Sequence, residues 1–262
     1  AFALPKAALC LLGLGNDISA RSLRSELKRI GSGIEISLLC AVPKGSGLGT
    51  SSILGATIMA ALHRFFGIQL DKDELFLQVL QMEQMLTTGG GWQDQIGGVE
   101  GGVKYISSKP AERPEPLIHH LDDYLFTSSE NRHRYTLFYT GITRLAKNIL
   151  QEVVSHVNSY EPAYLFTHQH LRELVTRTRL AILRRDYHGL ARVLSDSWKA
   201  NKLIHPSTTN PEVEELLIST QPNWHGMKLL GAGGGGYALF ASPTEKASDE
   251  LKGVLDTWSG NG

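Results

Sequence analysis

Two carboxylates, Glu83 and Asp94, could supply the acid groups that phosphoryl transfer requires. Glu83 ends an otherwise apolar stretch, VLQMEQML, and Asp94 lies within GGGWQDQIGG, where glycines expose the backbone and leave room for a ligand. Phosphoryl transfer uses one carboxylate to hold Mg²⁺ and one group to orient or deprotonate a hydroxyl. Taken singly, each acid is as readily interpreted as a solvated charge or as a residue that stabilises a turn.

A glycine-rich segment, PKGSGLGTSS at residues 43–52, is typical of a phosphate-binding loop. Glycines let the backbone approach an anion without a Cβ clash, and the first N–H groups of a helix attract negative charge. The glycines lack the Lys-Ser/Thr pair of a Walker loop, and their GxGxG spacing differs from the dinucleotide fingerprint. The hydroxyls that would complete the phosphate cradle belong to Ser46, Thr50, Ser51 and Ser52. A tight glycine turn with a helix cap is the plain structural alternative.

A second glycine-rich segment, KLLGAGGGGYALF, contains four successive glycines after a strand-like run. Four glycines cost conformational entropy, so we expect a compensating close approach to another backbone or to phosphate. A simple hairpin is the alternative, although hairpins seldom need four glycines.

The elements that must position these residues alternate between helix and strand patterns. IEISLLCAV, residues 34–42, predicts a strand, and the apolar run after residue 50 predicts a buried helix that ends at Gly67. Asp71 should cap a second helix. Residues 103–116 are loop-like. The rest of the chain predicts a strand at 134–141, helices within 142–220, two short strands around the four glycines and a final helix. The fold class is α+β.

Composition excludes several classes of function. The 262 residues carry 26 Lys+Arg and 26 Asp+Glu, so the whole chain offers no electrostatic reason to bind nucleic acid or an anionic membrane. No run reaches the roughly 20 apolar residues of a membrane helix. Cys10 and Cys40 lie in apolar runs and are expected to be buried thiols. We therefore expect a cytoplasmic protein. The His- and Asp-containing segments at 119–123 and 168–170 are interpreted as surface polar segments, since neither has a third ligand at metal-site spacing.

Taken in order, these motifs resemble those of the GHMP kinases, named for galactokinase, homoserine kinase, mevalonate kinase and phosphomevalonate kinase. PKGSGLGTSS is similar to the family's phosphate-binding motif, and KLLGAGGGGYALF to its glycine-rich third motif. The segments GTSSIL, TTGGGWQDQIGG, YTGITRLAKNIL and GAGGGGY look like those of L-fucokinases within this class. The resemblance implies transfer of a phosphoryl group from ATP to the anomeric hydroxyl of L-fucose, with ATP and Mg²⁺ as cofactors.

The resemblance also implies a role for each residue of the site. Ser51 and Glu83 would bind Mg²⁺, Asp94 would be the catalytic base, and Gly91 and Trp92 would line the sugar site. Core packing is the alternative role for Trp92. The ATP-binding set would be Gly45, Ser46, Gly47, Leu48, Gly49, Thr50, Ser51 and Ser52, with Gly233, Gly234 and Gly235 supporting that loop.

The family's first motif, similar to R-x-D-L-A-G-G-W-x-D, does not occur in this sequence. We therefore expect a fragment with an incomplete ribosomal protein S5 domain 2-like ATP-binding domain at 1–132 and a ferredoxin-like domain at 133–262. A nucleotidyltransferase domain could precede it in a longer protein.

Two alternatives stay open. A heptose-phosphate kinase shares the motif layout but should bring further cations to the site; Lys104, Arg144 and Lys147 are the candidates. A non-catalytic ligand-binding module of the same fold would not need Ser51, Glu83 and Asp94 together.

Overall fold

The computed structural model describes residues 2–14, 23–86, 91–111, 115–142, 155, 158–159 and 161–259. By packing, the chain divides into two compact units. The first unit is Ala1–Pro43 with Gly49–Gly101, and the second unit is Lys44–Leu48 with Gly102–Gly262. A short piece of the predicted phosphate loop thus packs with the C-terminal part of the chain, while the residues on both sides of it belong to the first unit.

This division by packing differs from the domain boundary predicted after residue 132. Residues 102–132 pack with later helices; Leu125, for example, is buried in one cluster with Ala181 and Tyr187. The domain division at residue 132 stays a prediction.

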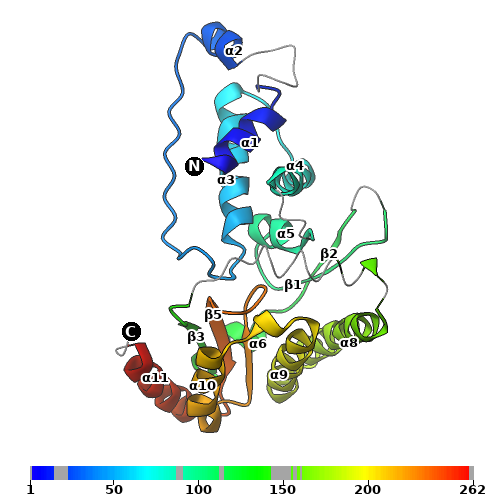
Figure 1. The fold of residues 1–262 in the computed structure, drawn as a ribbon, viewed down its shortest axis with the longest axis vertical. Helices are drawn as coiled ribbons and strands as arrows, with labels where there is room; N and C mark the ends of the chain where they lie inside the picture. Colours follow the sequence, from blue (N-terminus) through cyan, green and yellow to red (C-terminus); the bar gives the residue numbers. More distant parts are fainter. Residues whose placement is uncertain are drawn as a thin grey trace. The chain divides into compact units, whose positions relative to one another are not determined.

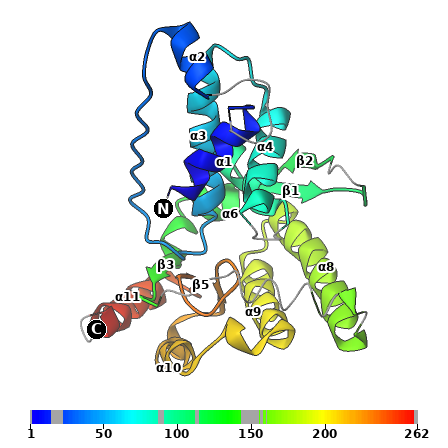
Figure 2. The same cartoon turned by 45° about the horizontal axis from the view of Figure 1, so that its top comes forward.

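The first unit is built from helices around α3, as Figures 1 and 2 show. On α3, Ala56, Met59 and Leu62 are buried in one cluster with residues of α1 and α4. Its helices are α1 (Ala3–Leu11), α2 (Leu23–Ile30), α3 (Thr50–Phe66), α4 (Lys72–Met85) and α5 (Gln93–Val99). The predicted caps are confirmed: α3 ends at Gly67 with φ of 69°, and the Asp71 side chain accepts a hydrogen bond from the Glu74 N–H over 2.7 Å.

The strand predicted at 34–42 is wrong. These residues form no strand, and the side chain of Leu39 is 93% exposed. A β-strand is stabilised by the N–H and C=O groups of a neighbouring strand, and no described residue pairs with this segment. The apolar and β-branched residues of 34–42 favour a β-strand, but this preference does not provide the neighbouring strand with which to pair.

The described residues of the second unit form two small sheets. β1 (Lys104–Ser107) pairs antiparallel with β2 (Leu117–His120), so the loop predicted at 103–116 is wrong for residues 104–107. The other sheet has the order β3-β5-β4 and is antiparallel throughout, with β3 at Tyr135–Tyr139, β4 at Gly226–Leu229 and β5 at Tyr237–Ala241. The strands around the four glycines are therefore confirmed as neighbours in one sheet.

Helices cover this sheet in the second unit (Figure 1). Side chains that alternate along β4 and β5, such as Leu229 and Phe240, are buried in one cluster with Leu216 and Leu255. The helices of this unit are α6 (Tyr124–Thr127), α8 (Pro162–Leu183), α9 (Tyr187–Ile204), α10 (Pro211–Thr220) and α11 (Glu245–Ser259), with single 3-10 turns at Arg132–Arg134, Pro206–Thr208 and Gln221–Asn223.

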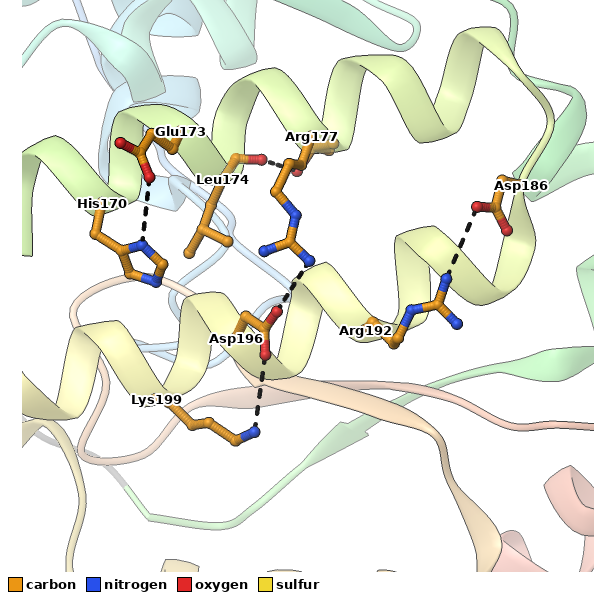
Figure 3. Close-up of polar contacts among 9 residues, drawn as sticks. His170, Glu173, Leu174, Arg177, Asp186, Arg192, Asp196 and Lys199 are labelled. Atoms are coloured by element: carbon orange, nitrogen blue, oxygen red, sulfur yellow. Dashed lines mark hydrogen bonds and ion pairs between the residues drawn. The ribbon is translucent and has the colours of Figure 1, made fainter.

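The pair α8 and α9 lies side by side and is bridged by charge (Figure 3). Arg177 of α8 donates to the Asp196 carboxylate of α9 over 3.2 Å, and Lys199 lies 3.7 Å from the same carboxylate. In the His-containing segment of α8, His170 Nδ1 lies 3.8 Å from a Glu173 carboxylate oxygen.

Candidate active site

The candidate site of the first unit is built around the buried carboxylate of Glu83, near the end of α4. Its oxygen Oε1 accepts hydrogen bonds from the Ser52 hydroxyl over 2.6 Å and from the Ser51 hydroxyl over 3.1 Å. Its oxygen Oε2 accepts a hydrogen bond from the Gln95 amide over 2.6 Å. Ser52 and Gln95 are each only 1% exposed, whereas Ser51 is exposed. The first turn of α3, the end of α4 and the start of α5 therefore meet at one carboxylate.

Asp94 belongs to the same group. It lies in the first turn of α5, and its carboxyl carbon is 3.5 Å from the position that a Cβ on Gly49 would occupy. Although Asp94 is exposed at the surface, partial burial of its carboxyl group raises its pKa above the ordinary 3.8, and the negative charge of Glu83 raises it further. A carboxylate with a raised pKa is better suited to accept a proton than an ordinary surface aspartate.

Two glycines allow these three helices to approach one another. A Cβ on Gly98 of α5 would lie 2.8 Å from Cγ1 of Ile53, in the first turn of α3. A Cβ on Gly55 would lie 2.3 Å from the end of the Met82 side chain. A larger residue at position 98 would also approach the Ile53 backbone at 3.3 Å and would push α5, which carries Asp94, away from α3. At position 55 the flexible Met82 side chain would have to move.

The oxygen donors Ser51 and Glu83 fit Mg²⁺, which prefers hard oxygen ligands. Among the described residues, no group of three or more His, Cys, Asp or Glu side chains could hold a metal ion. Mg²⁺ is commonly bound through one or two carboxylates together with phosphate oxygens and waters, so a pair of protein ligands is sufficient for an ion that arrives with a nucleotide.

The predicted phosphate loop includes Lys44–Leu48, which lies in the second unit and is described there by itself. The Ser46 side chain is fully buried, and its hydroxyl oxygen accepts a hydrogen bond from the Leu48 N–H over 3.3 Å. The Ser46 carbonyl accepts a hydrogen bond from the Tyr237 N–H over 2.9 Å. A Cβ on Gly47, whose φ is 76°, would lie 2.2 Å from the Leu230 carbonyl oxygen. Ser46 therefore shapes the loop instead of presenting its hydroxyl to a ligand.

The glycine-rich third motif supports this loop through Gly231 and Gly236, and not through the predicted Gly233, Gly234 and Gly235. Gly231 and Gly236 lie directly against residues 45–47: a Cβ on either would come within 2.8 Å of that backbone. Gly233 and Gly235 instead lie against the carbonyl groups of Thr208 and Ile142. Sequence reasoning missed Gly231 and Gly236, although both belong to the same GAGGGG segment.

Gly234 uses both of its backbone polar groups within the protein. Its N–H donates to the Thr208 carbonyl, and its carbonyl accepts a hydrogen bond from the Asn210 amide over 2.9 Å. The four successive glycines are thus explained by close approaches to three other backbone segments, as expected from their entropy cost.

The remaining predicted residues lie at helix starts. Gly49 is the N-cap of α3 and Thr50 is its first residue. Trp92 is the N-cap of α5 and is half-buried, and the described cluster around α3 does not include it. Gly91 is exposed with open space beside it.

Of the cations considered for a second phosphate, Lys104 donates to the Gly102 carbonyl over 3.1 Å, while Arg144 and Lys147 lie outside the described residues.

Gln95 is the residue of the carboxylate group that sequence reasoning missed. It is a nearly fully buried polar residue whose amide nitrogen is committed to Glu83. Its position next to Asp94 in the motif indicated a possible role in the site. Its burial, however, could not be predicted without knowing that residues 93–99 form a helix.

Comparison with known proteins identifies the family that this chain resembles. Residues 17–102 match the family described as GHMP kinases N terminal domain. The chain is 40% identical over 257 residues to an L-fucokinase/L-fucose-1-P guanylyltransferase of Bacteroides fragilis, covering 97% of this chain and 27% of that protein. It is 32% identical over 255 residues to a bifunctional fucokinase/GDP-fucose pyrophosphorylase of Arabidopsis thaliana, covering 97% of this chain and 23% of that protein. The chain thus spans about a quarter of the length of these relatives.

The fold is shared with the crystal structure of Streptococcus pneumoniae phosphomevalonate kinase in complex with phosphomevalonate and AMPPNP, with a TM-score of 0.71 at 13% identity over 98% of this chain and 78% of that one. The predicted α+β fold of GHMP kinases is confirmed, and residues 17–102 of this chain belong to the N-terminal domain family of the GHMP kinases. Within that family, it is similar to the kinase-containing proteins named for L-fucose. No described helix combines the length and apolarity that crossing a lipid bilayer requires.

Proposed function

We propose that this chain carries the catalytic residues of an ATP-dependent sugar kinase that phosphorylates the anomeric hydroxyl of L-fucose, giving fucose 1-phosphate and ADP. The observation that carries the proposal is the joining of Ser51, Ser52 and Glu83 with Asp94 at the first turn of α3. The similarity to the two L-fucose proteins supports the choice of sugar.

In this proposal, Asp94 accepts the proton of the sugar hydroxyl as its oxygen attacks the γ-phosphorus. The bond between the γ-phosphorus and the bridging oxygen breaks, and ADP leaves with that electron pair. Gly45 to Ser52 bind the phosphate groups of ATP, with Ser46 contributing its backbone alone because its hydroxyl is buried and bonded within the loop. Backbone N–H groups at the start of α3 stabilise negative charge. Ser51 and Glu83 hold Mg²⁺, which neutralises phosphate charge when bound. Gly91 and Trp92 line the sugar site.

An ADP-release assay with a panel of sugars tests the proposal. L-Fucose, galactose, mannose and a heptose 7-phosphate are offered to the protein that contains this chain, each with ATP and Mg²⁺. Preferred turnover of L-fucose is expected. Turnover of the heptose phosphate alone would assign the chain to the other sugar-kinase class, and ATP binding without turnover of any sugar would indicate a ligand-binding module.

The relatives carry a second activity in their names, guanylyltransferase or pyrophosphorylase. We propose the same pairing, and a cytoplasmic location, for the protein to which this chain belongs. Detection of GDP-fucose from fucose, ATP and GTP in one preparation tests the pairing.

A further inference from the structure

Lys228 is a half-buried lysine on β4 that the proposed reaction does not use. Its ammonium group donates to the Ser197 hydroxyl of α9 over 2.7 Å. In the orientation of the Asn201 amide that satisfies both its oxygen and its nitrogen, that oxygen accepts a second hydrogen bond from Lys228 over 3.0 Å. The two acceptors are one helical turn apart on α9, so they hold the ammonium group from the same side.

No described carboxylate balances the charge of Lys228. Its recorded partners are a hydroxyl and an amide, and burial, with no contribution from an acidic group, lowers its pKa to about 8. Other lysines of this unit differ. Lys202 Nζ lies 3.1 Å from the Glu214 carboxylate. Lys199 lies 3.7 Å from Asp196, as Figure 3 shows. A partly buried cation held by neutral groups keeps one donor for a further acceptor.

The surroundings of Lys228 contain few other titratable groups. Across the sheet it faces Leu239, and the diagonal neighbours on β5 are Tyr237 and Ala241. On α9 its contacts are the neutral Ser197 and Asn201. The charged residues nearby in the α9 sequence are paired elsewhere: Asp196 with Arg177 and Lys199, and Lys202 with Glu214.

The two elements that hold Lys228 both lead to the glycine-rich motif. β4 ends at Leu229, and the next carbonyl, that of Leu230, lies against Gly47. α9 leads into Thr208, whose carbonyl accepts the N–H of Gly234. Lys228 is two residues before Leu230, roughly 7 Å along an extended strand. The strand that carries this uncompensated cation therefore leads directly into the backbone that supports the loop Lys44–Leu48, all within the second unit.

We propose that Lys228 is the cation that binds a phosphate group at the glycine-motif end of the second unit, with Ser197 and Asn201 holding its ammonium group in place. The inference rests on the proposed phosphoryl transfer. Two sources share this chemistry, the nucleotide and the phosphorylated sugar.

Competitive acetylation of lysines, quantified by peptide mass spectrometry, tests the binding directly. The rate at Lys228 is measured at pH 8 alone and with inorganic phosphate, with a non-hydrolysable ATP analogue and Mg²⁺, or with fucose 1-phosphate. Binding of an anion stabilises the charged, unreactive amine, so the rate at Lys228 should fall at least threefold with the anion that binds there, and the rate at Lys202 should not change. Protection by the nucleotide or by the sugar phosphate identifies the source. Unchanged reactivity with all three probes would overturn the proposal.

Variants add a second measurement. Lys228→Met should weaken binding of the protecting anion at least tenfold. Lys228→Arg should retain the binding, and the binding should no longer be lost above pH 8. Lys202→Met is the matched control and should bind as the wild type does. Equal affinity in Lys228→Met would contradict the proposal; if that variant fails to fold, acetylation of the wild type decides. Protection of Lys228 without L-fucose turnover would leave this inference standing while the proposed substrate fails.

Discussion

The Ser52 hydroxyl donates a 2.6 Å hydrogen bond to Oε1 of the buried Glu83 carboxylate, whereas the Ser51 hydroxyl donates to the same atom over 3.1 Å. Ser52 is buried and Ser51 is exposed, so neighbouring serines of one motif have separate tasks. Ser52 fixes the carboxylate, and Ser51 is left at the surface, where a metal ion could bind.

Ser52→Ala should destabilise the protein because it removes a hydrogen bond to a buried charge. We expect a loss of about 1.5–3 kcal/mol in the free energy of unfolding, measured by urea denaturation. Ser51→Ala is the matched control, with an expected loss below about 1 kcal/mol because the group is exposed. Turnover in Ser51→Ala should fall and its requirement for Mg²⁺ should rise. Equal stability losses in the two variants would refute the division of tasks.

Asp94→Asn should abolish phosphorylation while ATP binding remains near normal, since the proposed role of Asp94 is to accept a proton. Turnover by quantitative product assay and nucleotide binding by calorimetry separate the two. Near-normal turnover in this variant would remove Asp94 from the mechanism.

The raised pKa of Asp94 predicts that both turnover and stability depend on pH. Because the pKa of Asp94 is raised, turnover should begin to fall, as pH decreases, at a higher pH than an ordinary carboxyl with a pKa of 3.8 would give. The folded state binds this proton more tightly than the unfolded state does. The contribution of Asp94 to stability therefore increases as pH falls from the raised value towards 3.8. Asp94→Asn should accordingly raise Tm at pH 7, and this gain should shrink on acidification. A Tm difference independent of pH would show that the pKa of Asp94 is not raised in the folded protein.

Gln95→Glu should be more destabilising at pH 7 than Gln95→Leu. Leucine removes the donor to Glu83 Oε2, with an expected loss of about 1–3 kcal/mol. Glutamate in addition places a second negative charge beside a buried carboxylate. The extra loss in Gln95→Glu should diminish at low pH, where carboxyls become protonated, and thermal unfolding from pH 4 to 8 measures it. If leucine is the more harmful at every pH, Gln95 acts through packing.

Gly47→Ala should destabilise the second unit, because φ is 76° and the new Cβ would overlap the Leu230 carbonyl. A loss of at least about 1–3 kcal/mol is expected from backbone strain. Gly253→Ala on α11 is the control, since nothing lies within 4 Å of its Cβ position and alanine favours a helix. Hydrogen exchange at the Tyr237 amide reports the first effect specifically, because that amide bonds to Ser46.

The sequence predicted what depends on local residues. Short segments of the sequence were sufficient to predict the helix that ends at Gly67, the cap at Asp71 and the two strands around the four glycines. The prediction of a strand at 34–42 failed because strand pairing depends on a partner that is distant in sequence. Glu83 and Asp94 were named from residue type and motif, but Gln95 was not, because its burial follows from the packing of α5 on α3. Similarly, the contacts of Gly231 and Gly236 with residues 45–47 arise only when two remote segments meet.

The bond between Ser46 and Tyr237 also has a consequence for the order of folding. Synthesis proceeds from the N-terminus, so every residue of the first unit is made before the strand that receives the loop Lys44–Leu48. The helices around α3 can pack early through contacts with one another, while the described partners of the loop are made only with residues 230–237. Completion of the loop requires closure of a long stretch of chain, which is slow compared with helix packing. We expect a nascent chain to hold its carboxylate group in place well before its phosphate loop takes its final form.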